Sequence, residues 1–369
     1  MLRRASETPV KKSLVSQFGT SNLRGLFAFT LCSIGAVLAM FAFASPPAGL
    51  GQWTIISSPN TSGTQNNYLT TVSCASATNC WAAGFYYDAN NQAKTLLEYE
   101  SSSGWSIELA PAPTNGPQHL LTAITCVSAT NCWGVGYYED TSLTLIGTVD
   151  TLTEHFDGSA WGIVTSPNGQ TGTMDSRLWS VSCPAADDCW AVGEYLAPGV
   201  FSLTPSSVYQ TLIEHNTGSG WVVVSSPNVT IPVGRSDPTG QTDNVLLGVS
   251  CASQNDCWAV GWFYNAVGIG QPLTEHYDGT AWSLATSPNI GYSFLQGASC
   301  TGTNDCWAVG FYNNASGPLQ TLAEHYDGTA WSIVSSPNNP NGQNNELYNV
   351  NCNQQCQLLG RRRSVQRLQ

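Results

Sequence analysis

A line of apolar and polar residues recurs along the chain after residue 50. In its copies, Leu247–Cys251 and Trp282–Thr286 alternate bulky and small side chains, which is the period of a half-buried β-strand. Cys306–Tyr312 is a continuous apolar run, typical of a strand covered on both faces, and Thr321–Tyr326 is a fourth candidate strand. Asp327-Gly328 follows it and favours a tight reversal of the chain. Each copy therefore predicts four short antiparallel strands, and no helical periodicity follows residue 45.

The copies form five complete repeats and the start of a sixth. The line reads WSIVSSPN, a variable loop, LxxVSC, five residues, CWAVGxY, a second variable loop and TLxEHYDGTAW. Spacing within the motifs is constant while the loops differ in length, as in a scaffold that tolerates loop variation. We therefore predict an all-β chain, a β-propeller of four-stranded antiparallel blades with five complete blades and an incomplete sixth. The first Trp of the line recurs as Trp53, Trp105, Trp161, Trp221, Trp282 and Trp331, and the second as Trp81, Trp133, Trp190, Trp258 and Trp307.

The order of the motifs resembles that of the kelch and galactose-oxidase-like propellers. In those families a Gly-ended apolar strand, a Tyr-Asp strand and a Trp strand follow one another, and CWAVGFY, EHYDG and WSIVSSPN fill these places over residues 53–356. A single Gly replaces the kelch Gly pair, and the Cys-x5-Cys-Trp-Ala-Val-Gly element suggests an exported bacterial type. The Asp-box propellers, which include sialidases, resemble the chain through DGTAW. They rank second because DGTAW is one residue short of the Asp-box spacing.

The kelch-like order of the strands determines where each blade begins and ends. Each blade starts at the VSC strand and closes with the WSIV strand. Residues 51–60 then form a lone outer strand that can complete the last blade and close the ring. The blades are expected at about 69–113, 120–168, 178–228, 246–289 and 295–338.

Residues 1–44 predict an export signal. Five basic residues within the first 24 precede an uncharged apolar run, 25–44, that ends Ala-Phe-Ala, a pattern typical of a cleavage site. The run is also long enough to cross a bilayer as an uncleaved transmembrane helix. A signal peptide and a signal anchor both stay open, with 45–52 as a linker. In either case the repeats are predicted to be secreted or held on the outer face of the cell membrane.

Charge excludes two classes of partner. Only 10% of the residues are charged, and the formal net charge is -12. Between Ser45 and Cys356 the basic residues are Lys94, Arg177 and Arg235, against 23 carboxylates. Such a surface repels phosphate, so we expect no nucleic-acid partner and no membrane contact except through 25–44, if that segment is uncleaved.

Ten cysteines fall into pairs that share one spacing of six. Each pair flanks five residues rich in Asn, Asp, Ser and Thr, a turn composition, so the two sulfurs can face each other across a hairpin. An exported chain meets an oxidising compartment, where such pairs become disulfides. A zinc site would need a second pair nearby and a narrower spacing. We therefore predict the disulfides Cys74–Cys80, Cys126–Cys132, Cys183–Cys189, Cys251–Cys257 and Cys300–Cys306.

Four Glu-His doublets are the most prominent candidates for chemistry. Neighbours on a strand point to opposite faces, so the Glu and His of one doublet cannot act on the same substrate atom. A column of them around a central channel could serve as a metal or proton site. The alternative is a network that fixes each blade, bonded to a Trp indole or a turn backbone, and repetition favours it because repeated features serve the repeat. The doublets are Glu154-His155, Glu214-His215, Glu275-His276 and Glu324-His325, and the first blade has Glu98-Tyr99.

Missing residues weigh against two enzyme classes. A sialidase-like site needs an arginine cluster, and the repeats contain only Arg177 and Arg235. A galactose-oxidase-like copper site needs an unpaired Cys crosslinked to Tyr, and the cysteines of the five complete repeats all fall into pairs. A glycosidase with two carboxylates stays possible. We assign no catalytic residue, cofactor or metal ligand. The carboxylates outside the repeat pattern are Glu108, Glu139, Asp140, Asp150, Asp175, Glu194, Asp237 and Asp243.

Two tryptophans, Trp179 and Trp262, lie outside the motif columns. Burial is the common fate of Trp, but aromatic rings in a weakly charged surface also suit stacking on sugar rings. Constant strands, variable loops and no asymmetric catalytic set favour a non-enzymatic module that binds carbohydrate or protein through its loops. The alternative is a carbohydrate-active hydrolase or lyase that uses two loop carboxylates.

The last residues, 357–369, break the repeat. After LYNVNC a Cys is due at position 358, followed by Trp-Ala-Val-Gly, but the chain continues Gln-Leu-Leu-Gly-Arg-Arg-Arg. The codons CAA TTG CTG GGC CGT CGG CGC encode these residues and, read one base later, give Asn-Cys-Trp-Ala-Val-Gly. We therefore expect this basic tail to be a frameshift product, with Cys356 lacking a designed partner. The alternative is a cationic interaction tail.

Overall fold

The computed structural model describes residues 55–61, 66–142, 148–169, 175–197, 208–231, 242–313, 317–339, 343–353 and 355–357. The expected export signal at 1–44, the linker and the basic tail beyond 357 lie outside these residues. Within the described part, no helix reaches the length and hydropathy needed to cross a membrane.

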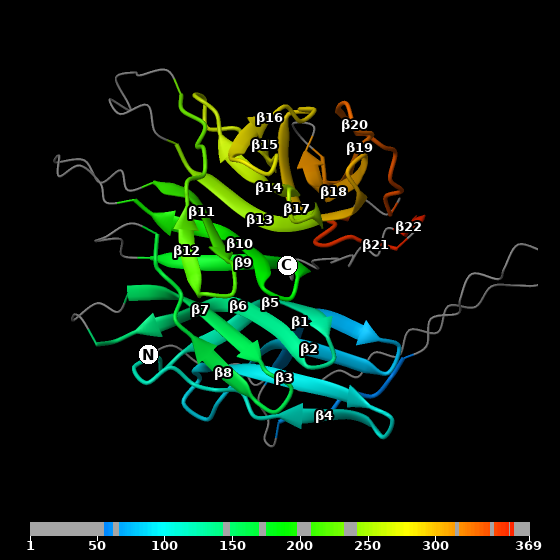
Figure 1. Ribbon diagram of the computed structural model, residues 1–369. Helices are drawn as coiled ribbons and strands as arrows, with labels where there is room; N and C mark the ends of the chain where they lie inside the picture. Colours follow the sequence, from blue (N-terminus) through cyan, green and yellow to red (C-terminus); the bar gives the residue numbers. More distant parts are fainter. Residues whose placement is uncertain are drawn as a thin grey trace, which may run out of the picture. The chain divides into compact units, whose positions relative to one another are not determined.

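Five four-stranded antiparallel sheets follow one another along the chain, and in each the strands lie side by side in chain order (Figure 1). This confirms the all-β propeller fold class and the expected blade phase, from the VSC strand inside to the Trp strand outside. The first three blades are β1 (Asn67–Ser76), β2 (Asn79–Tyr87), β3 (Ala93–Ser101), β4 (Gly104–Glu108); β5 (His119–Ser128), β6 (Asn131–Asp140), β7 (Thr148–Phe156), β8 (Trp161–Val164); and β9 (Ser176–Ala185), β10 (Asp188–Leu196), β11 (Tyr209–Asn216), β12 (Trp221–Val224). The fourth and fifth are β13 (Asn244–Ser253), β14 (Asp256–Tyr264), β15 (Gly270–Tyr277), β16 (Trp282–Ala285); and β17 (Tyr292–Gly302), β18 (Asp305–Asn313), β19 (Gln320–Tyr326), β20 (Trp331–Ile333).

A disulfide joins the first two strands of every blade. In the first blade Cys74 lies directly opposite Cys80 in the register of β1 and β2, with 3.9 Å between their Cα atoms. The short turn between these strands explains why the spacing of six recurs unchanged. All five predicted pairs are disulfides in the structure, and their Cα separations are 3.9–4.1 Å.

The single Gly of each CWAVG motif marks a β-bulge in the inner strand. Gly193 pairs with Leu178 while the preceding Val192 pairs with Ser180, so Trp179 is the extra residue of β9. A Cβ atom on Gly193 would lie 1.8 Å from the carbonyl oxygen of Arg177, closer than any two such atoms approach. Glycine is therefore required by close backbone approach at this position.

Neighbouring blades pack through tryptophans. The second-strand Trp of one blade meets the outer-strand Trp of the next edge-on: the ring centroids of Trp81 and Trp161 are 5.2 Å apart, and those of Trp190 and Trp282 are 5.3 Å apart. Adjacent inner strands are also linked, because the Cys126 amide donates to Ser73 Oγ at 2.9 Å. Four such Trp pairs join the five blades in sequence.

Residues 343–353 hold the inner-strand position of the expected sixth blade. Leu347 and Val350 pack on Val309 and Ala323 of the fifth blade. The Cys352 amide donates to Ser299 Oγ at 2.9 Å, the link that joins other inner strands. The strands β21 (Asn351–Asn353) and β22 (Gln355–Gln357) then form a two-stranded sheet in which Cys352 lies opposite Cys356. Cys352 is disulfide-bonded.

The outer strand expected at 51–60 is not formed in its described part. Residues 55–61 carry no strand hydrogen bonds. An outer strand needs a third strand beside it to satisfy its backbone groups. Within the described residues, the sixth blade offers only its inner strand and the short β22.

Candidate functional site

The histidine of each doublet belongs to the scaffold of its own blade. The ring of His215 stacks on Trp190, with centroids 3.8 Å apart. Its Nε2 lies 2.7 Å from Oδ1 of Asp188, the residue before the second Cys. In the first blade Tyr99 takes this place and its hydroxyl accepts a hydrogen bond from Asn79. The partner of the His ring nitrogen is thus an Asp or Asn side chain and not a Trp indole or a turn backbone; the other pairs are His155–Asn131, His276–Asp256 and His325–Asp305.

The glutamate of each doublet faces the other way and is buried against the preceding blade. Glu214 is fully buried, and its Oε2 accepts a hydrogen bond of 2.7 Å from Ser166, in the loop that leaves the preceding blade. Burial raises the pKa of Glu214 to about 8, and the Ser166 hydrogen bond offsets this in part. These glutamates therefore link blades and lie away from solvent. The corresponding pairs are Ser226–Glu275, Ser287–Glu324 and Ser58–Glu98.

Glu154 is the exception in this series. Both of its carboxyl oxygens are buried and have no hydrogen-bond partner within the described residues. The loop position that holds Ser166 after the second blade is Ala110 after the first, where it packs against the interface with the second blade. Burial alone raises the pKa of Glu154 to about 8. A buried polar group without a partner destabilises the fold.

Restoring the missing donor should stabilise the protein. We expect Ala110→Ser to raise the free energy of unfolding by about 1 kcal/mol, the usual net value of a buried hydrogen bond. Ser226→Ala, which removes the equivalent donor to Glu275, should lower it by a similar or larger amount. Urea unfolding of both variants checks this, and a destabilising Ala110→Ser would show that the position does not face Glu154.

One row of cross-strand pairs differs from blade to blade. It joins the residue after the Gly of each CWAVG motif to the inner strand, at the end of the blades away from the disulfide hairpins. Four of the pairs are apolar or aromatic, and the third is the ion pair Arg177–Glu194. The pairs are Tyr68–Phe85, Leu120–Tyr137, Arg177–Glu194, Val245–Trp262 and Phe294–Phe311.

Arg177 is the centre of an asymmetric cluster in this row. Its Nη2 lies 3.2 Å from Asp175 Oδ2 and its Nη1 lies 3.4 Å from Glu194 Oε1. Nη1 also donates to the Tyr209 hydroxyl at 3.4 Å, and the guanidinium carbon lies 5.5 Å from the ring centre of Tyr137. Burial raises the pKa of Glu194, and the charge of Arg177 acts against this. The arginine is thus already neutralised by the protein's own carboxylates.

Trp179 extends the cluster from the bulge of β9. Its ring packs edge-on against that of Tyr137, with centroids 5.7 Å apart. Bulges re-aim a side chain, so this position can present a residue that the regular pleat would turn away. The same bulge position holds Thr70, Thr122, Leu247 and Gln296 in the other blades. Arg177, Trp179, Glu194, Tyr137 and Tyr209 are called the Arg177 cluster below.

Trp262 lies in a purely aromatic group. Its ring centre is 5.0 Å from that of Tyr264 and 5.2 Å from that of Phe294. Tyr292 packs on the same Phe294 and is 39% exposed, whereas Trp262 is half-buried. The structure therefore keeps Trp179 and Trp262 in different blades and in different surroundings.

Some of the carboxylates outside the repeat pattern lie close to one another. Asp150 accepts a hydrogen bond from the Tyr138 hydroxyl at 3.4 Å, and burial, helped by the nearby charges of Asp140 and Asp175, raises its pKa. Asp243 accepts from the Tyr209 amide at 2.8 Å. Glu139 pairs with Gln118, Glu108 accepts from Ser106, and Asp237 lies outside the described residues. In the described part of the chain, no three His, Cys, Asp or Glu side chains are placed to hold a metal ion.

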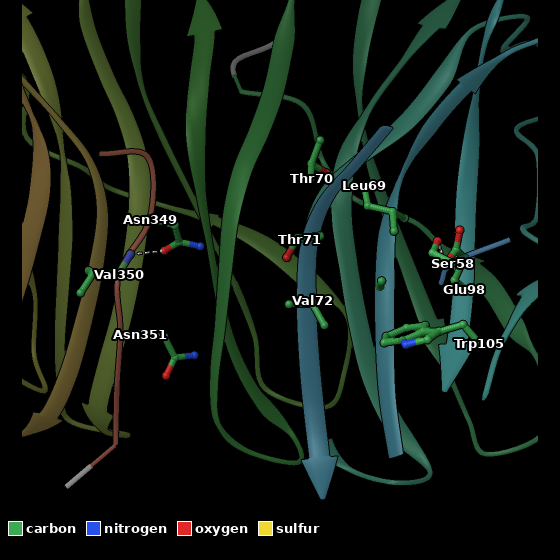
Figure 2. Close-up of a pocket in the computed structure, with 11 residues that line it drawn as sticks. Ser58, Leu69, Thr70, Thr71, Val72, Glu98, Trp105, Asn349, Val350 and Asn351 are labelled. Atoms are coloured by element: carbon green, nitrogen blue, oxygen red, sulfur yellow. Dashed lines mark hydrogen bonds between the residues drawn. The ribbon is translucent and has the colours of Figure 1, made fainter. Parts of the chain in front are cut away.

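A cavity of about 470 Å³ lies elsewhere, on the face of the first blade (Figure 2). Its lining crosses all four strands of that sheet, from Leu69 and Val72 in β1 to Ala82, Glu98 and Trp105. Asn349–Asn351 border its other side. No motif in the sequence indicates this cavity, because it depends on which blade faces remain uncovered.

No protein-family model matches the chain, and no curated protein sequence matches it. Among solved structures, the chain is similar to the six-bladed β-propeller lectin of Aleuria aurantia, with 12% identity over 77% of this chain and 84% of the lectin, and a TM-score of 0.45. A protein from Dyadobacter fermentans gives 12% identity over 73% and 83%, with a TM-score of 0.44. A family 25 polysaccharide lyase, an ulvan lyase, gives 9% over 74% and 72%, also with 0.44. These likenesses concern the fold alone.

Proposed function

We propose that this protein is an exported β-propeller that binds carbohydrate through the Arg177 cluster, on a scaffold of kelch-like repeats. The observation that carries the proposal is that the repeated side chains and the non-repeated side chains have different roles. The repeated His and Glu side chains are used within and between blades. The Arg177 cluster instead gathers an indole, phenol rings and a compensated ion pair in one place.

The chemistry of the Arg177 cluster suits a polyhydroxylated ligand. Flat aromatic rings stack on the apolar faces of sugars, and fixed polar groups orient their hydroxyls. Because Arg177 is paired with Asp175 and Glu194, it offers hydrogen bonds without a strong net positive charge. A neutral sugar fits this better than an acidic one. The broader form of the proposal includes a protein ligand that binds at the same cluster.

Export is part of the proposal. Five disulfides are typical of proteins that fold in an oxidising compartment. We propose that residues 1–44 direct the chain out of the cell, as a cleaved signal or as an anchor that leaves the repeats on the outer face.

A glycan array probed with the native protein tests the proposal. We expect Trp179→Ala to weaken binding of an array ligand about tenfold or more, as loss of a stacking anchor does. Tyr68→Ala, an exposed aromatic at the same row of the first blade, should leave the affinity unchanged. Empty glycan and protein pull-down screens beside measurable hydrolase turnover would refute the binding function.

A carbohydrate-active hydrolase or lyase is the second candidate. Asp150 favours it, because a carboxyl with a raised pKa beside other carboxylates suits general acid catalysis. Release of sugar fragments by the native protein, abolished by Asp150→Asn, would support it.

A further inference from the structure

One interface between blades lacks an aromatic ring that the equivalent interfaces contain. The ring belongs to the residue after the His of each doublet, which lies opposite the second Cys of its blade. In the fourth blade it is Tyr277, which packs on Trp190 of the preceding blade and on Trp282 of its own, with ring centroids 4.6 and 5.6 Å away. In the third blade Asn216 stands at this position. The ring pairs at the other two interfaces are Phe156–Trp81 and Tyr326–Trp258.

The turn that follows this position also differs in the third blade. In the fourth blade Oδ1 of Asp278 accepts hydrogen bonds from the amides of Thr280 and Ala281. In the third blade the turn reads Asn-Thr-Gly-Ser-Gly, and Oδ1 of Asn216 accepts from the Gly218 amide at 2.9 Å. The Asn side chain therefore stabilises the turn in place of the missing Asp, and no ring takes the position against the second blade.

A cavity of about 280 Å³ lies at this interface, and both Trp133 and Asn216 line it. Trp133 is 8% exposed. The equivalent tryptophans that a ring covers are 1–3% exposed, and they are Trp81, Trp190 and Trp258. A small residue in place of a large one leaves a void where the surroundings do not collapse. The walls include Trp133, His155 and Val164 of the second blade and Cys189, Asn216 and Gly220 of the third.

The lining of this cavity favours an uncharged ligand. The exposed residues Asp187 and Gly218 border it, so the cavity opens to solvent. The described residues that line it include no lysine or arginine, and Asp187 brings a carboxylate. His155 stacks on Trp133 with ring centroids 4.3 Å apart, and burial lowers the pKa of His155, so its ring is neutral at pH 7. An anionic ligand would therefore meet a carboxylate and no compensating cation.

We propose that this cavity binds a small uncharged aromatic molecule of the phenol class, whose ring takes the place that Tyr277 holds at the next interface. A cavity left by a missing apolar group can take up a free aromatic ring. The ring would pack on Trp133 in the tilted geometry of the equivalent pairs. Because Cys189 lines the cavity, it lies at the end of the blades that carries the disulfide hairpins. It is separate from the Arg177 cluster and does not depend on the proposed sugar binding.

The probe is p-cresol, which is the tyrosine side chain as a free molecule. Calorimetric titration of native, disulfide-intact protein should show one saturable equivalent, with a dissociation constant of about 1 mM or tighter. In p-toluate a carboxylate replaces the hydroxyl, and we expect it to bind about fivefold weaker or more because Asp187 repels it. Absence of saturable p-cresol binding, or equal affinity for p-toluate, overturns the proposal.

A double variant fills the cavity from within the chain. Asn216→Tyr with Thr217→Asp restores the Tyr-Asp turn of the other blades, and its melting temperature checks that it folds. We expect it to weaken p-cresol binding about tenfold or more, as loss of a binding pocket does. Thr217→Asp alone is the matched control, because Thr217 is exposed and the cavity stays open, so binding should equal that of the native protein. Binding that survives in the double variant overturns the proposal.

A variant that creates a second cavity makes the test independent of how the double variant folds. Tyr277→Asn with Asp278→Thr and Ala281→Gly transfers the turn of the third blade to the fourth. This variant should raise the number of p-cresol molecules bound per chain from one to two. A number that stays at one would show that loss of the ring does not create a binding site, and would overturn the proposal.

Discussion

Reduction of the disulfides is expected to lower the midpoint of thermal unfolding by roughly 15 °C. Each bridge closes a loop with a sequence separation of six, for which chain entropy gives about 2.4 kcal/mol. Five bridges together give roughly 10 kcal/mol, comparable with the whole stability of a typical domain. The effect is large because the bridges join strands in every blade. Calorimetry with and without reductant measures it.

A single-site variant separates this effect from general damage by the reductant. Cys251→Ala should leave Cys257 as the thiol that reacts in the unfolded protein, and it should lower the free energy of unfolding by about one fifth of the full effect. Val267, which is 76% exposed, offers a control position where Val267→Ala should change little. Native protein that shows five pairs of reactive thiols would contradict the disulfides.

Stability is expected to fall as the pH rises from 6.5 to 8.5. Burial raises the pKa of Glu154, Glu214 and Glu275 to about 8 and that of Glu324 to about 7, above the value near 4.5 of an exposed glutamate. Between these values the folded state holds protons that the unfolded state releases. The free energy of unfolding therefore decreases with pH across this range and levels off above it. Denaturant unfolding at a series of pH values measures the slope.

Below pH 6.5, two histidines change the free energy of unfolding in the opposite direction. Burial lowers the pKa of His119 to about 4 and also lowers that of His155, so their contribution rises with pH up to about 6.5 and is then complete. Glu154→Gln should flatten the slope most clearly, since Glu154 has no donor to hold its charge. A stability that stays constant or rises between pH 6.5 and 8.5 would show that these carboxyls are not buried in solution.

The parts of the fold that repeat locally could be predicted from the sequence. A strand pair such as β1 and β2 is set by a short turn and by alternation within ten residues, so the disulfide between Cys74 and Cys80 follows from spacing and compartment. The blade phase follows from the same constancy. The separation of Glu and His onto opposite faces also follows from the strand period alone.

Contacts between blades could not be predicted in the same way. The donor to Glu214 is Ser166, 48 residues away, and nothing in either motif shows that they meet. The consequence of Ala110 likewise depends on a contact between blades, because it leaves Glu154 without a hydrogen-bond donor. The sequence shows that Trp179 lies outside the repeat, but its place on a bulge depends on the register of β9 and β10. The variable residue after each CWAVG motif was the signal that could have located the row around it.

The most direct test of the division between scaffold and site is the glycan-array profile of the native protein beside Trp179→Ala and His276→Ala. We expect Trp179→Ala to lose the ligands that the native protein binds while melting close to the native temperature. His276→Ala, which removes the contacts to Asp256 and Trp258, should melt lower yet keep the native profile below its melting temperature. A profile lost in His276→Ala and kept in Trp179→Ala would contradict the assignment of function to the Arg177 cluster.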